Sequence, residues 1–332
     1  MTSVPRYRIL ISVMGLAVVG LFAGSLLTGP AHVPVGASLH ALFMGDDMLA
    51  QVMREVRLPR ALLGLMVGAA LGLSGAVLQA FLRNPLAEPG LIGTSGSAAL
   101  GAVLAIQGGL AASFPLGLPL AALCGAFLSV GLILMLAGPR GGTLALILAG
   151  VAISALAGAA TSLVLNLSSN PFAANEIIFW MMGSLADRSM LHVWIAAPFM
   201  AAGFILLWPL RRGLEALTLG EDAAASSGIL LGRLRLMLIC GVAALVGGAT
   251  AVAGAVGFVG LVVPHVLRHA VGGSPSRLVP ASALGGAAMV LAADIAVRLL
   301  MPDRDLKLGV LTAIVGAPFL LHLILRTRRA AT

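Results

Sequence analysis

Side chains that could do chemistry are few in this chain, and they are scattered. The acids within or beside the apolar segments, such as Glu176, Asp187 and Asp294, stand singly rather than as paired carboxylates. No local Ser-His-Asp arrangement and no H-E-x-x-H metal motif can be assembled. Acid–base catalysis and metal-assisted hydrolysis both need several such groups held together. We therefore expect no catalytic centre, and the chain is not predicted to be an enzyme.

A nucleotide-hydrolysing site is also missing from the sequence. The phosphate-binding loop G-x-x-x-x-G-K-[ST] holds phosphates with its backbone and its lysine. The only lysine in this chain is Lys307, which has no such glycine-rich context. The chain cannot hydrolyse ATP by that chemistry. If it takes part in ATP-driven transport, the ATPase is a separate polypeptide.

Charged residues inside or beside apolar runs are the next candidates. Asp294 and Arg298 are four residues apart, so a helix would place them on one face, where they can pair. Arg57 and Arg60 bracket Pro59 at the start of another apolar run. Planar guanidinium groups bind carboxylates bidentately, and they also extend to membrane interfaces. Both roles stay open for these arginines.

His265 invites a metal-ligand or heme-ligand interpretation. Only His269 follows at ligand spacing, and Arg268 stands beside it. We favour packing at a turn near Pro264 over ligation. No metal site is predicted.

The two cysteines, Cys124 and Cys240, fall in separate apolar segments. They do not make a disulfide framework and lack metal-site spacing. We expect both thiols to be buried and to act as small apolar packing residues.

Composition places the chain in a membrane. It is 60% hydrophobic and 10% charged, with a mean hydropathy of +1.08. Soluble domains carry about 25% charged residues. A soluble fold would leave the apolar segments with nowhere to be buried. The net charge of +8 is therefore attributed to loops at a membrane surface and not to a nucleic-acid partner.

The whole chain, 1–332, is predicted as a single transmembrane domain. A helix needs about 20 apolar residues to cross a bilayer. Thirteen of the 20 basic residues fall on the side that holds both predicted termini, so the positive-inside rule places both termini in the cytoplasm. The ten predicted spans are 9–27, 60–82, 91–107, 115–137, 143–166, 190–210, 234–254, 257–271, 278–299 and 308–326.

A faint internal repeat links the two halves. Residues 74–77, S-G-A-V, resemble residues 253–256, A-G-A-V, and in both copies a proline follows the glycine by ten residues. The two predicted spans run in opposite directions, so the repeat would be inverted, as is common in transporters. Chance similarity between helices that pack through small residues is the alternative.

Two longer motifs resemble a known family. Residues 57–101 begin R-L-P-R, continue through a glycine-rich run and include N-P-L-A-E-P-G-L-I-G; residues 254–269 read GAVGFVGLVVPHVLRH. Both are similar to segments of the FecCD-type permeases, which carry iron–siderophore complexes, heme and vitamin B12 through ATP-driven importers. The resemblance covers almost the whole chain. It implies an all-α integral membrane permease with about ten helices, folded like the cobalamin permease.

The same resemblance implies partners. The permease would act as a homodimer in the inner membrane with two copies of an ABC ATPase subunit, which uses the ATP. A soluble periplasmic or extracellular binding protein would deliver substrate to the outer face, and the pathway would run between the two permease subunits. No cofactor is expected on the permease itself.

The substrate implied is an iron chelate. Heme is placed ahead of a ferric siderophore because N-P-L-A-E-P-G-L-I-G is nearer the heme and cobalamin members, and cobalamin is the alternative. Two alternatives come from other classes: an ion-coupled secondary carrier that works alone, and an intramembrane enzyme, which the lack of a catalytic cluster disfavours. Co-purification with an ATPase would separate the importer from both.

Three groups of site residues follow from the resemblance. Docking of the binding protein is assigned by matching positions to Arg57, Arg60 and Arg298, expected as a basic patch on the outer face. The inner gate is assigned to Asn84, Leu86 and Thr143. The cytoplasmic loop 211–233 is expected to form two short helices that dock on the ATPase, through Leu219, Gly220, Glu221, Ala224, Ala225 and Gly228.

The sequence departs from the family pattern at three positions near these site residues. Ser227 stands where a leucine is usual, which removes one apolar contact from the loop that would meet the ATPase. Asp305 and Lys307 stand where the family has glutamate and proline, which leaves the geometry beside Arg298 open.

Overall fold

The computed structural model describes residues 4–29, 33–45, 47–138, 142–301 and 306–331, and every regular element in these ranges is a helix. The elements, in chain order, are α1 (Val4–Leu27), α2 (Val35–Phe43), α3 (Met48–Gln51), the π-helical turn η1 (Val52–Arg57), α4 (Leu58–Phe81), η2 (Pro89–Ile92), α5 (Thr94–Gln107), α6 (Leu110–Ser113), α7 (Gly117–Ala137), α8 (Thr143–Leu167), α9 (Pro171–Met181), α10 (Met190–Leu207), η3 (Trp208–Leu210), α11 (Arg211–Leu217), α12 (Glu221–Ser226), α13 (Leu231–Ala253), α14 (Val259–Ala270), α15 (Pro275–Leu300) and α16 (Leu308–Ala331).

Local signals set several helix limits. Asn170 precedes Pro171 at the start of α9, and its side chain accepts a hydrogen bond from the Phe172 backbone N–H at 3.0 Å. Asparagine at the N-cap and proline at the first position both favour a helix start. Gly138 follows the last residue of α7 with a φ of 68°, a conformation that glycine adopts without strain. Such signals lie in the sequence beside the apolar runs, where they mark the first or the last residue of a helix.

The predicted all-helical membrane fold is confirmed, and each of the ten predicted spans coincides with a helix. Within the described residues, seven helical segments are long and apolar enough to cross a membrane. The helices α5 and α14 have 14 and 12 residues, which reach about 21 and 18 Å at 1.5 Å per residue. Both lengths fall short of the roughly 30 Å hydrocarbon core, so the count of ten describes helices better than full crossings.

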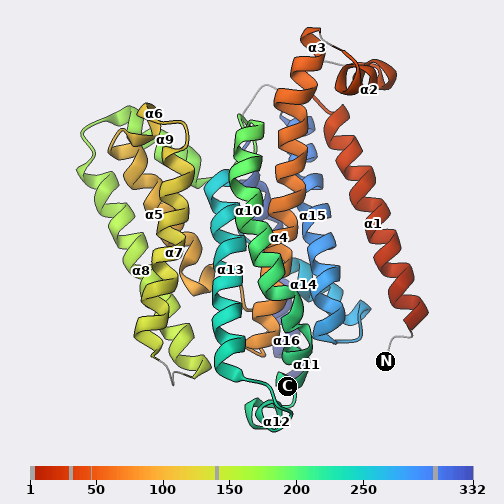
Figure 1. The fold of residues 1–332 in the computed structure, drawn as a ribbon, viewed down its shortest axis with the longest axis vertical. Helices are drawn as coiled ribbons and strands as arrows, with labels where there is room; N and C mark the ends of the chain where they lie inside the picture. Colours follow the sequence, from red (N-terminus) through yellow and green to blue (C-terminus); the bar gives the residue numbers. More distant parts are fainter. Residues whose placement is uncertain (1–3, 30–32, 46, 139–141, 302–305, 332) are drawn as a thin grey trace.

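Two antiparallel helices, α4 and α13, form the centre of the bundle (Figure 1). Their most apolar windows are 78% and 83% buried, against 11% for α1. The two segments of the faint repeat lie on these central helices or at their ends. Small residues allow the close packing: a Cβ on Gly72 of α4 would overlap the Ser282 carbonyl of α15, and one on Gly101 of α5 would overlap the Ala121 carbonyl of α7.

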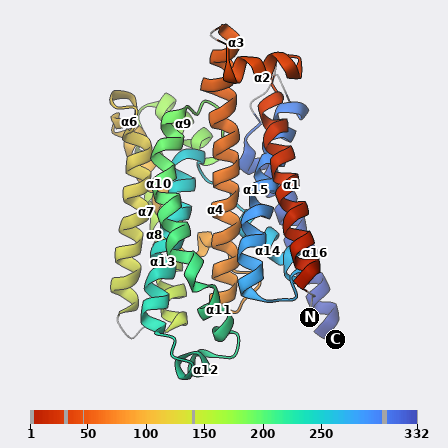
Figure 2. The same cartoon turned by 45° about the vertical axis from the view of Figure 1, so that its right-hand side comes forward.

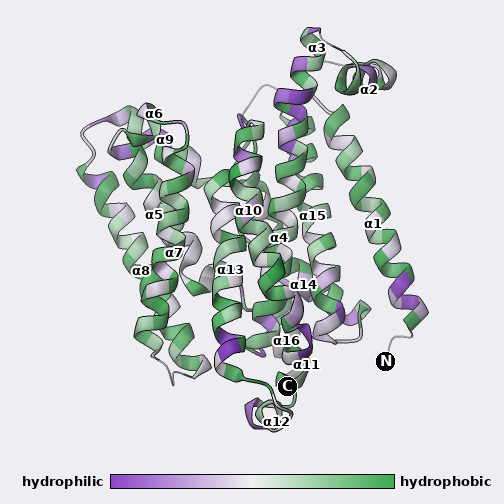
Figure 3. Cartoon of the chain, viewed as in Figure 1, coloured by the Kyte–Doolittle hydropathy of each residue, from purple (hydrophilic) through white to green (hydrophobic). Residues whose placement is uncertain are grey.

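The helices run between two polar ends. Both termini lie at the end that carries α12, here named the α12 end, and α2 and α3 lie at the opposite end, named the α2 end (Figures 1 and 2). Hydrophilic residues gather towards these two ends, and the band between them is largely hydrophobic (Figure 3). Placement of both termini at one end matches the even number of predicted helices.

One expectation about packing was wrong. Cys240 is half-buried, but Cys124 is exposed on α7. The apolar run that contains Cys124 does not reveal which of its faces meets another helix, because α7 is apolar around its whole circumference and only part of it is covered.

Candidate functional site

Asp294 of α15 binds two of the predicted docking arginines at the α2 end. Its carboxylate is 2.8 Å from a guanidinium nitrogen of Arg60 and 2.8 Å from one of Arg298. Arg60 also donates through Nε to both carboxylate oxygens, at 2.9 and 3.1 Å. Asp294 is 1% exposed. The predicted pairing of Asp294 with Arg298 is confirmed, and Arg60 joins it from α4.

The arginines also hold the end of α1. Arg298 donates through Nη1 to the carbonyls of Ser25 and Thr28, at 2.9 and 2.7 Å. Arg57 donates through Nη1 to those of Leu26 and Leu27, at 3.2 and 3.3 Å. The last carbonyls of a helix have no partner within the helix and carry partial negative charge, so cations stabilise them. Arg57, Arg60, Arg298 and Asp294 are named the arginine cluster.

The cluster differs from the exposed basic patch that was expected. Arg57 is 4% exposed, because its guanidinium lies against the end of α1. Arg60 and Arg298 are half-buried against Asp294. Of the neighbouring departures from the family pattern, Asp305 lies outside the described residues, and the Lys307 ammonium lies 5.3 Å from the centre of the Phe179 ring. Docking at this cluster stays a prediction.

The predicted gate residues Asn84 and Leu86 share the turn that follows α4. The Asn84 side-chain oxygen accepts a hydrogen bond from the Leu86 backbone N–H at 2.9 Å, an Asx turn that fixes the local backbone. The Leu86 side chain is exposed. The turn thus presents an apolar side chain from a backbone stiffened by Pro85 and Pro89.

The two family-like motifs meet at this turn. The Glu88 carboxylate accepts a hydrogen bond from the Phe258 backbone N–H at 2.7 Å, at the start of α14. A Cβ on Gly75 would overlap the Gly260 carbonyl, and one on Gly260 would lie 2.6 Å from Pro89 Cδ. A carboxylate at the start of a helix accepts hydrogen bonds from N–H groups that have no partner within the helix, and its negative charge is stabilised by the positive end of the helix dipole. Residues 170 positions apart therefore hold the turn after α4 against α14.

A buried glutamine extends this contact. Gln79 of α4 donates to the Leu261 carbonyl at 3.2 Å, and its side-chain oxygen accepts from Arg268 at 2.9 Å.

The His265 ring packs edge-on against Phe319 of α16 with ring centres 5.7 Å apart. Among the described residues, no three His, Cys, Asp or Glu side chains gather as a metal site would require.

Two short helices, α11 and α12, form within the predicted loop 211–233, and α13 already begins at Leu231, before the predicted end of the loop. Leu219 is 80% exposed, and Ala225 and Gly228 are also exposed. Gly220 and Gly228 have positive φ values of 113° and 84°, which fit glycine. Ala224 differs, because it is fully buried in the core of the chain itself and so does not face a partner in this conformation. Ser227 is exposed beside Gly228.

One residue of this loop reaches the third predicted gate residue. Thr143, the first residue of α8, donates its hydroxyl to Glu221 Oε1 at 2.8 Å. The other oxygen of Glu221 is 2.8 Å from Nη2 of Arg235 in the first turns of α13. The carboxylate of Glu221 therefore joins α12 to the start of α8 and to α13, and these three residues are named the Glu221 bridge.

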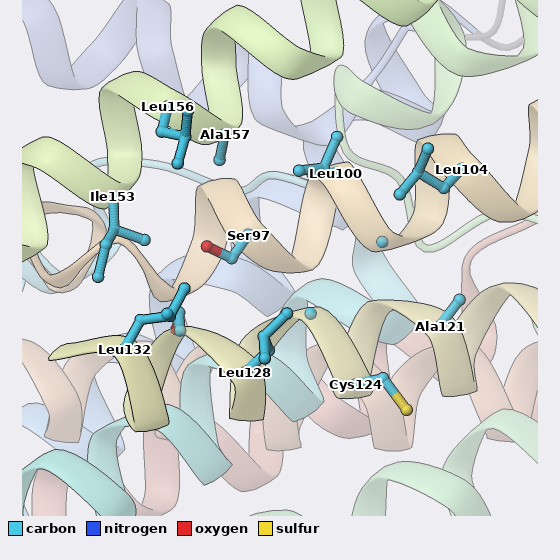
Figure 4. Close-up of a pocket in the computed structure, with 13 residues that line it drawn as sticks. Ser97, Leu100, Leu104, Ala121, Cys124, Leu128, Leu132, Ile153, Leu156 and Ala157 are labelled. Atoms are coloured by element: carbon cyan, nitrogen blue, oxygen red, sulfur yellow. The ribbon is translucent and has the colours of Figure 1, made fainter. Parts of the chain in front are cut away.

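An apolar pocket of about 550 Å³ lies between α5, α7 and α8. Side chains such as Leu100, Leu128, Ile153 and Leu156 line it, with the exposed thiol of Cys124 at its edge (Figure 4). No charged side chain lines it. It offers a surface for apolar contact.

Comparison with known proteins decides the family. The sequence profile of the FecCD transport family matches residues 16–326. The chain belongs to this family. The resemblance that the N-P-L-A-E-P-G and P-H-x-x-R motifs indicated is therefore confirmed over nearly the full length.

Several members of the FecCD family are similar to this chain. It is 39% identical over 293 residues to the hemin transport system permease protein HmuU of Yersinia pestis, covering 85% of this chain and 86% of that protein. It is 38% identical over 314 residues to the Fe(3+) dicitrate transport system permease protein FecD of Escherichia coli, covering 94% and 97%. It is 37% identical over 306 residues to the vitamin B12 import system permease protein BtuC of Klebsiella pneumoniae, covering 92% and 89%.

A solved structure has the same fold. A metal-chelate type ABC transporter in an inward-facing conformation aligns with a TM-score of 0.82 at 32% identity, covering 96% of this chain and 99% of that chain. The shared fold therefore extends over almost the whole chain.

Sequence reasoning missed three contacts in this FecCD-family chain: Arg60 with Asp294, Glu88 with the Phe258 N–H, and Thr143 with Glu221. The three acids, Asp294, Glu88 and Glu221, could be seen in or beside apolar runs. Thr143 and Glu221 were each predicted as site residues, one for the gate and the other for contact with the ATPase. No sequence signal paired them, because the partners lie 234, 170 and 78 positions apart.

Proposed function

We propose that this FecCD-family chain is the permease subunit of a binding-protein-dependent ABC importer that moves an iron chelate across the inner membrane. The observation that carries the proposal is the family match over residues 16–326. Relatives named for hemin and ferric dicitrate support an iron chelate, and a relative named for vitamin B12 supports the alternative. Heme is placed first and a ferric siderophore second, and cobalamin is the alternative.

ATP hydrolysis is assigned to a separate subunit, present in two copies per permease dimer. The sequence has no phosphate-binding loop of its own. The exposed surface of Leu219, Ala225 and Gly228 at the α12 end suits a short helical element that enters a groove of another protein. This assignment places the α12 end and both termini in the cytoplasm.

The Glu221 bridge supports a route from that surface to the gate. A movement of α12 imposed by the ATPase would reach the start of α8 through the bond between Glu221 and Thr143. It would reach α13 through Arg235. The gate itself is assigned to Leu86, Asn84 and Thr143 of both subunits, around a pathway at the dimer axis.

Docking of the binding protein is assigned to the α2 end. Within the arginine cluster, Arg60 has the most exposed side chain, so it is the best placed to meet a carboxylate of another protein. Arg57 and Arg298 keep α1 in position behind it. Charge pairs across such an interface fix orientation and the rate of association.

Reconstitution tests the proposed function. The permease is incorporated in liposomes with its ATPase and binding protein, and uptake and ATP hydrolysis are compared for heme, a ferric siderophore and cobalamin. We expect binding-protein-dependent uptake of one iron chelate that stops without ATP. Uptake by the permease alone, driven by an ion gradient, would replace this function with that of a secondary carrier. Uptake of cobalamin alone would overturn the iron-chelate assignment.

A further inference from the structure

A second pocket lies at the α12 end, and its lining includes no residue of the turn after α4 or of the Glu221 bridge. Its volume is about 550 Å³. It is formed where α1 begins, where α10 passes through η3 into α11, and where α15 begins. Its lining residues include Tyr7, Trp208, Arg211, Arg212, Glu215 and Arg277. It is named the Trp208 pocket.

Two arginines of the Trp208 pocket are held in place by aromatic rings. The Arg211 guanidinium lies 3.8 Å from the centre of the Trp208 ring, and its Nε donates to the Trp208 carbonyl at 2.9 Å. The Arg277 guanidinium lies 5.5 Å from the centre of the Tyr7 ring, and the Tyr7 hydroxyl donates to the Arg277 carbonyl at 3.4 Å. Stacked arginines lose less side-chain freedom when they bind a ligand.

The charge of the pocket is positive. Among the described residues that line the pocket, Arg211, Arg212 and Arg277 are basic and Glu215 is the one acid; its carboxylate accepts a hydrogen bond from the Ser274 hydroxyl at 2.9 Å. Arginine is the side chain best suited to bind phosphate oxygens through parallel N–H groups. The ligand chemistry that fits is therefore a phosphate group.

The place of the pocket identifies the source of that phosphate. Three candidate membrane segments, Val4–Leu27, Met190–Leu217 and Pro275–Leu300, meet there. Tryptophan and tyrosine are enriched where a membrane meets water, and the pocket holds one of each. Ile9 of α1 and Ile205 of α10 are exposed and lie within a few residues of Tyr7 and Trp208 along the chain. They belong to the apolar parts of these helices, against which lipid acyl chains would lie.

We propose that the Trp208 pocket binds the phosphate headgroup of an anionic phospholipid at the cytoplasmic membrane surface. Basic pockets between membrane helices on that side bind such headgroups. The assignment rests on the cytoplasmic placement of the α12 end given under the proposed function. Because α11 forms one wall, a bound lipid would join the membrane surface to the first helix of the loop 211–233.

The test uses the full chain purified in a neutral detergent, with bound lipid counted by native mass spectrometry. Phosphatidylglycerol, phosphatidylcholine and inorganic phosphate are titrated separately. We expect retention of phosphatidylglycerol over phosphatidylcholine, with inorganic phosphate a weak competitor. One arginine near a membrane surface contributes about a five-fold change in affinity, so Arg211→Gln with Arg277→Gln should weaken phosphatidylglycerol binding about 30-fold.

Two further variants keep the test decisive. Arg212→Gln changes an exposed pocket residue and should weaken binding about five-fold without affecting folding. Arg83→Gln removes the same charge from the exposed turn after α4 at the same end, outside the pocket, and should leave binding unchanged. Equal binding by the Arg212→Gln and unmodified chains, or an equal loss in Arg83→Gln, would overturn the site. Displacement of phosphatidylglycerol by inorganic phosphate at matched concentration would overturn the lipid as its source.

These outcomes are independent of transport. A chain that binds phosphatidylglycerol as expected but shows no ATP-driven uptake would contradict the proposed function and leave the lipid site standing. A chain that imports a chelate but has no preference for phosphatidylglycerol would contradict the lipid site alone.

Discussion

Glu221 of α12 and Thr143, the first residue of α8, are joined by a hydrogen bond of 2.8 Å between the hydroxyl and a carboxylate oxygen. One of these residues was assigned to ATPase coupling and the other to the inner gate. Their contact joins the helix proposed to meet the ATPase to a residue proposed for the inner gate. The second carboxylate oxygen binds Arg235, so the connection also includes the central helix α13.

Removal of the Thr143 hydroxyl should loosen this connection. We expect Thr143→Val to raise the amount of ATP hydrolysed per substrate imported several-fold, since a hydrogen bond to a charged group contributes about 1.5–3 kcal/mol. Thr143→Ser retains the hydroxyl and should behave like the unmodified chain. Hydrolysis and uptake are measured together in proteoliposomes.

A double-mutant cycle sharpens this test. Glu221→Ala combined with Thr143→Val should cost no more coupling than Glu221→Ala alone, because the Thr143 hydroxyl has already lost its acceptor. Glu215→Ala, which removes an acid of α11 that bonds to Ser274 instead, serves as the control. Strictly additive losses would show that Thr143 and Glu221 act separately.

Gly228→Arg should uncouple ATP hydrolysis from uptake. Gly228 has a φ of 84°, and a Cβ there would meet open space, so the large side chain would project into the surface assigned to the ATPase. Gly228→Asn is the matched control, because asparagine tolerates the left-handed conformation and is small. Full transport by Gly228→Arg in a correctly inserted permease would remove this surface from the docking assignment.

Asp294→Asn should destabilise the α2 end. The change leaves Arg60 and Arg298 half-buried without their shared counter-charge, and breaking a buried ion pair costs about 3–5 kcal/mol. We expect a lower unfolding temperature in detergent and easier proteolysis of the connection after α1. Asp222→Asn, at an exposed acid on α12, should change stability by less than about 0.5 kcal/mol. Similar unfolding temperatures for the two variants would contradict the structural role of the arginine cluster.

Arg60→Gln should weaken association of the binding protein, most clearly at low salt. Screening shortens the reach of surface charges as salt rises, so the difference from the unmodified permease should shrink at high ionic strength. Arg83→Gln removes an exposed charge from the turn after α4 at the α12 end and should not alter association. Association is measured on immobilised permease. An unchanged rate for Arg60→Gln at low salt would leave the cluster with a purely structural role.

Gly72→Ala should destabilise the contact between α4 and α15. The new methyl group would overlap the Ser282 carbonyl, and overpacking in a close-packed interior typically costs about 1–3 kcal/mol. Gly20→Ala on α1, where a Cβ would meet open space, is the matched control. Alanine is the better helix former, by up to about 1 kcal/mol. Thermal unfolding in detergent should therefore separate the two variants in opposite directions.

The sequence by itself determined the membrane class, the positions of ten helices and the family. Apolar runs bounded by glycine, proline and charge identify helices locally, because hydropathy and helix limits depend on neighbouring residues. The pairing of Asp294 with Arg298 could be predicted for the same reason, since four residues along a helix bring side chains to one face. Helix length relative to the bilayer was less well predicted, as the short α5 and α14 show.

Tertiary structure alone decided which residues meet across the bundle. Arg60 reaches Asp294, Glu88 reaches the Phe258 N–H, and Arg57 turns to the end of α1 instead of to solvent. Each of these contacts depends on how two helices cross, and their crossing depends on small residues such as Gly72 and Gly75 fitting against a distant backbone. A periodic pattern specifies that a helix forms, but the partner of a buried charge is fixed only when the helices pack.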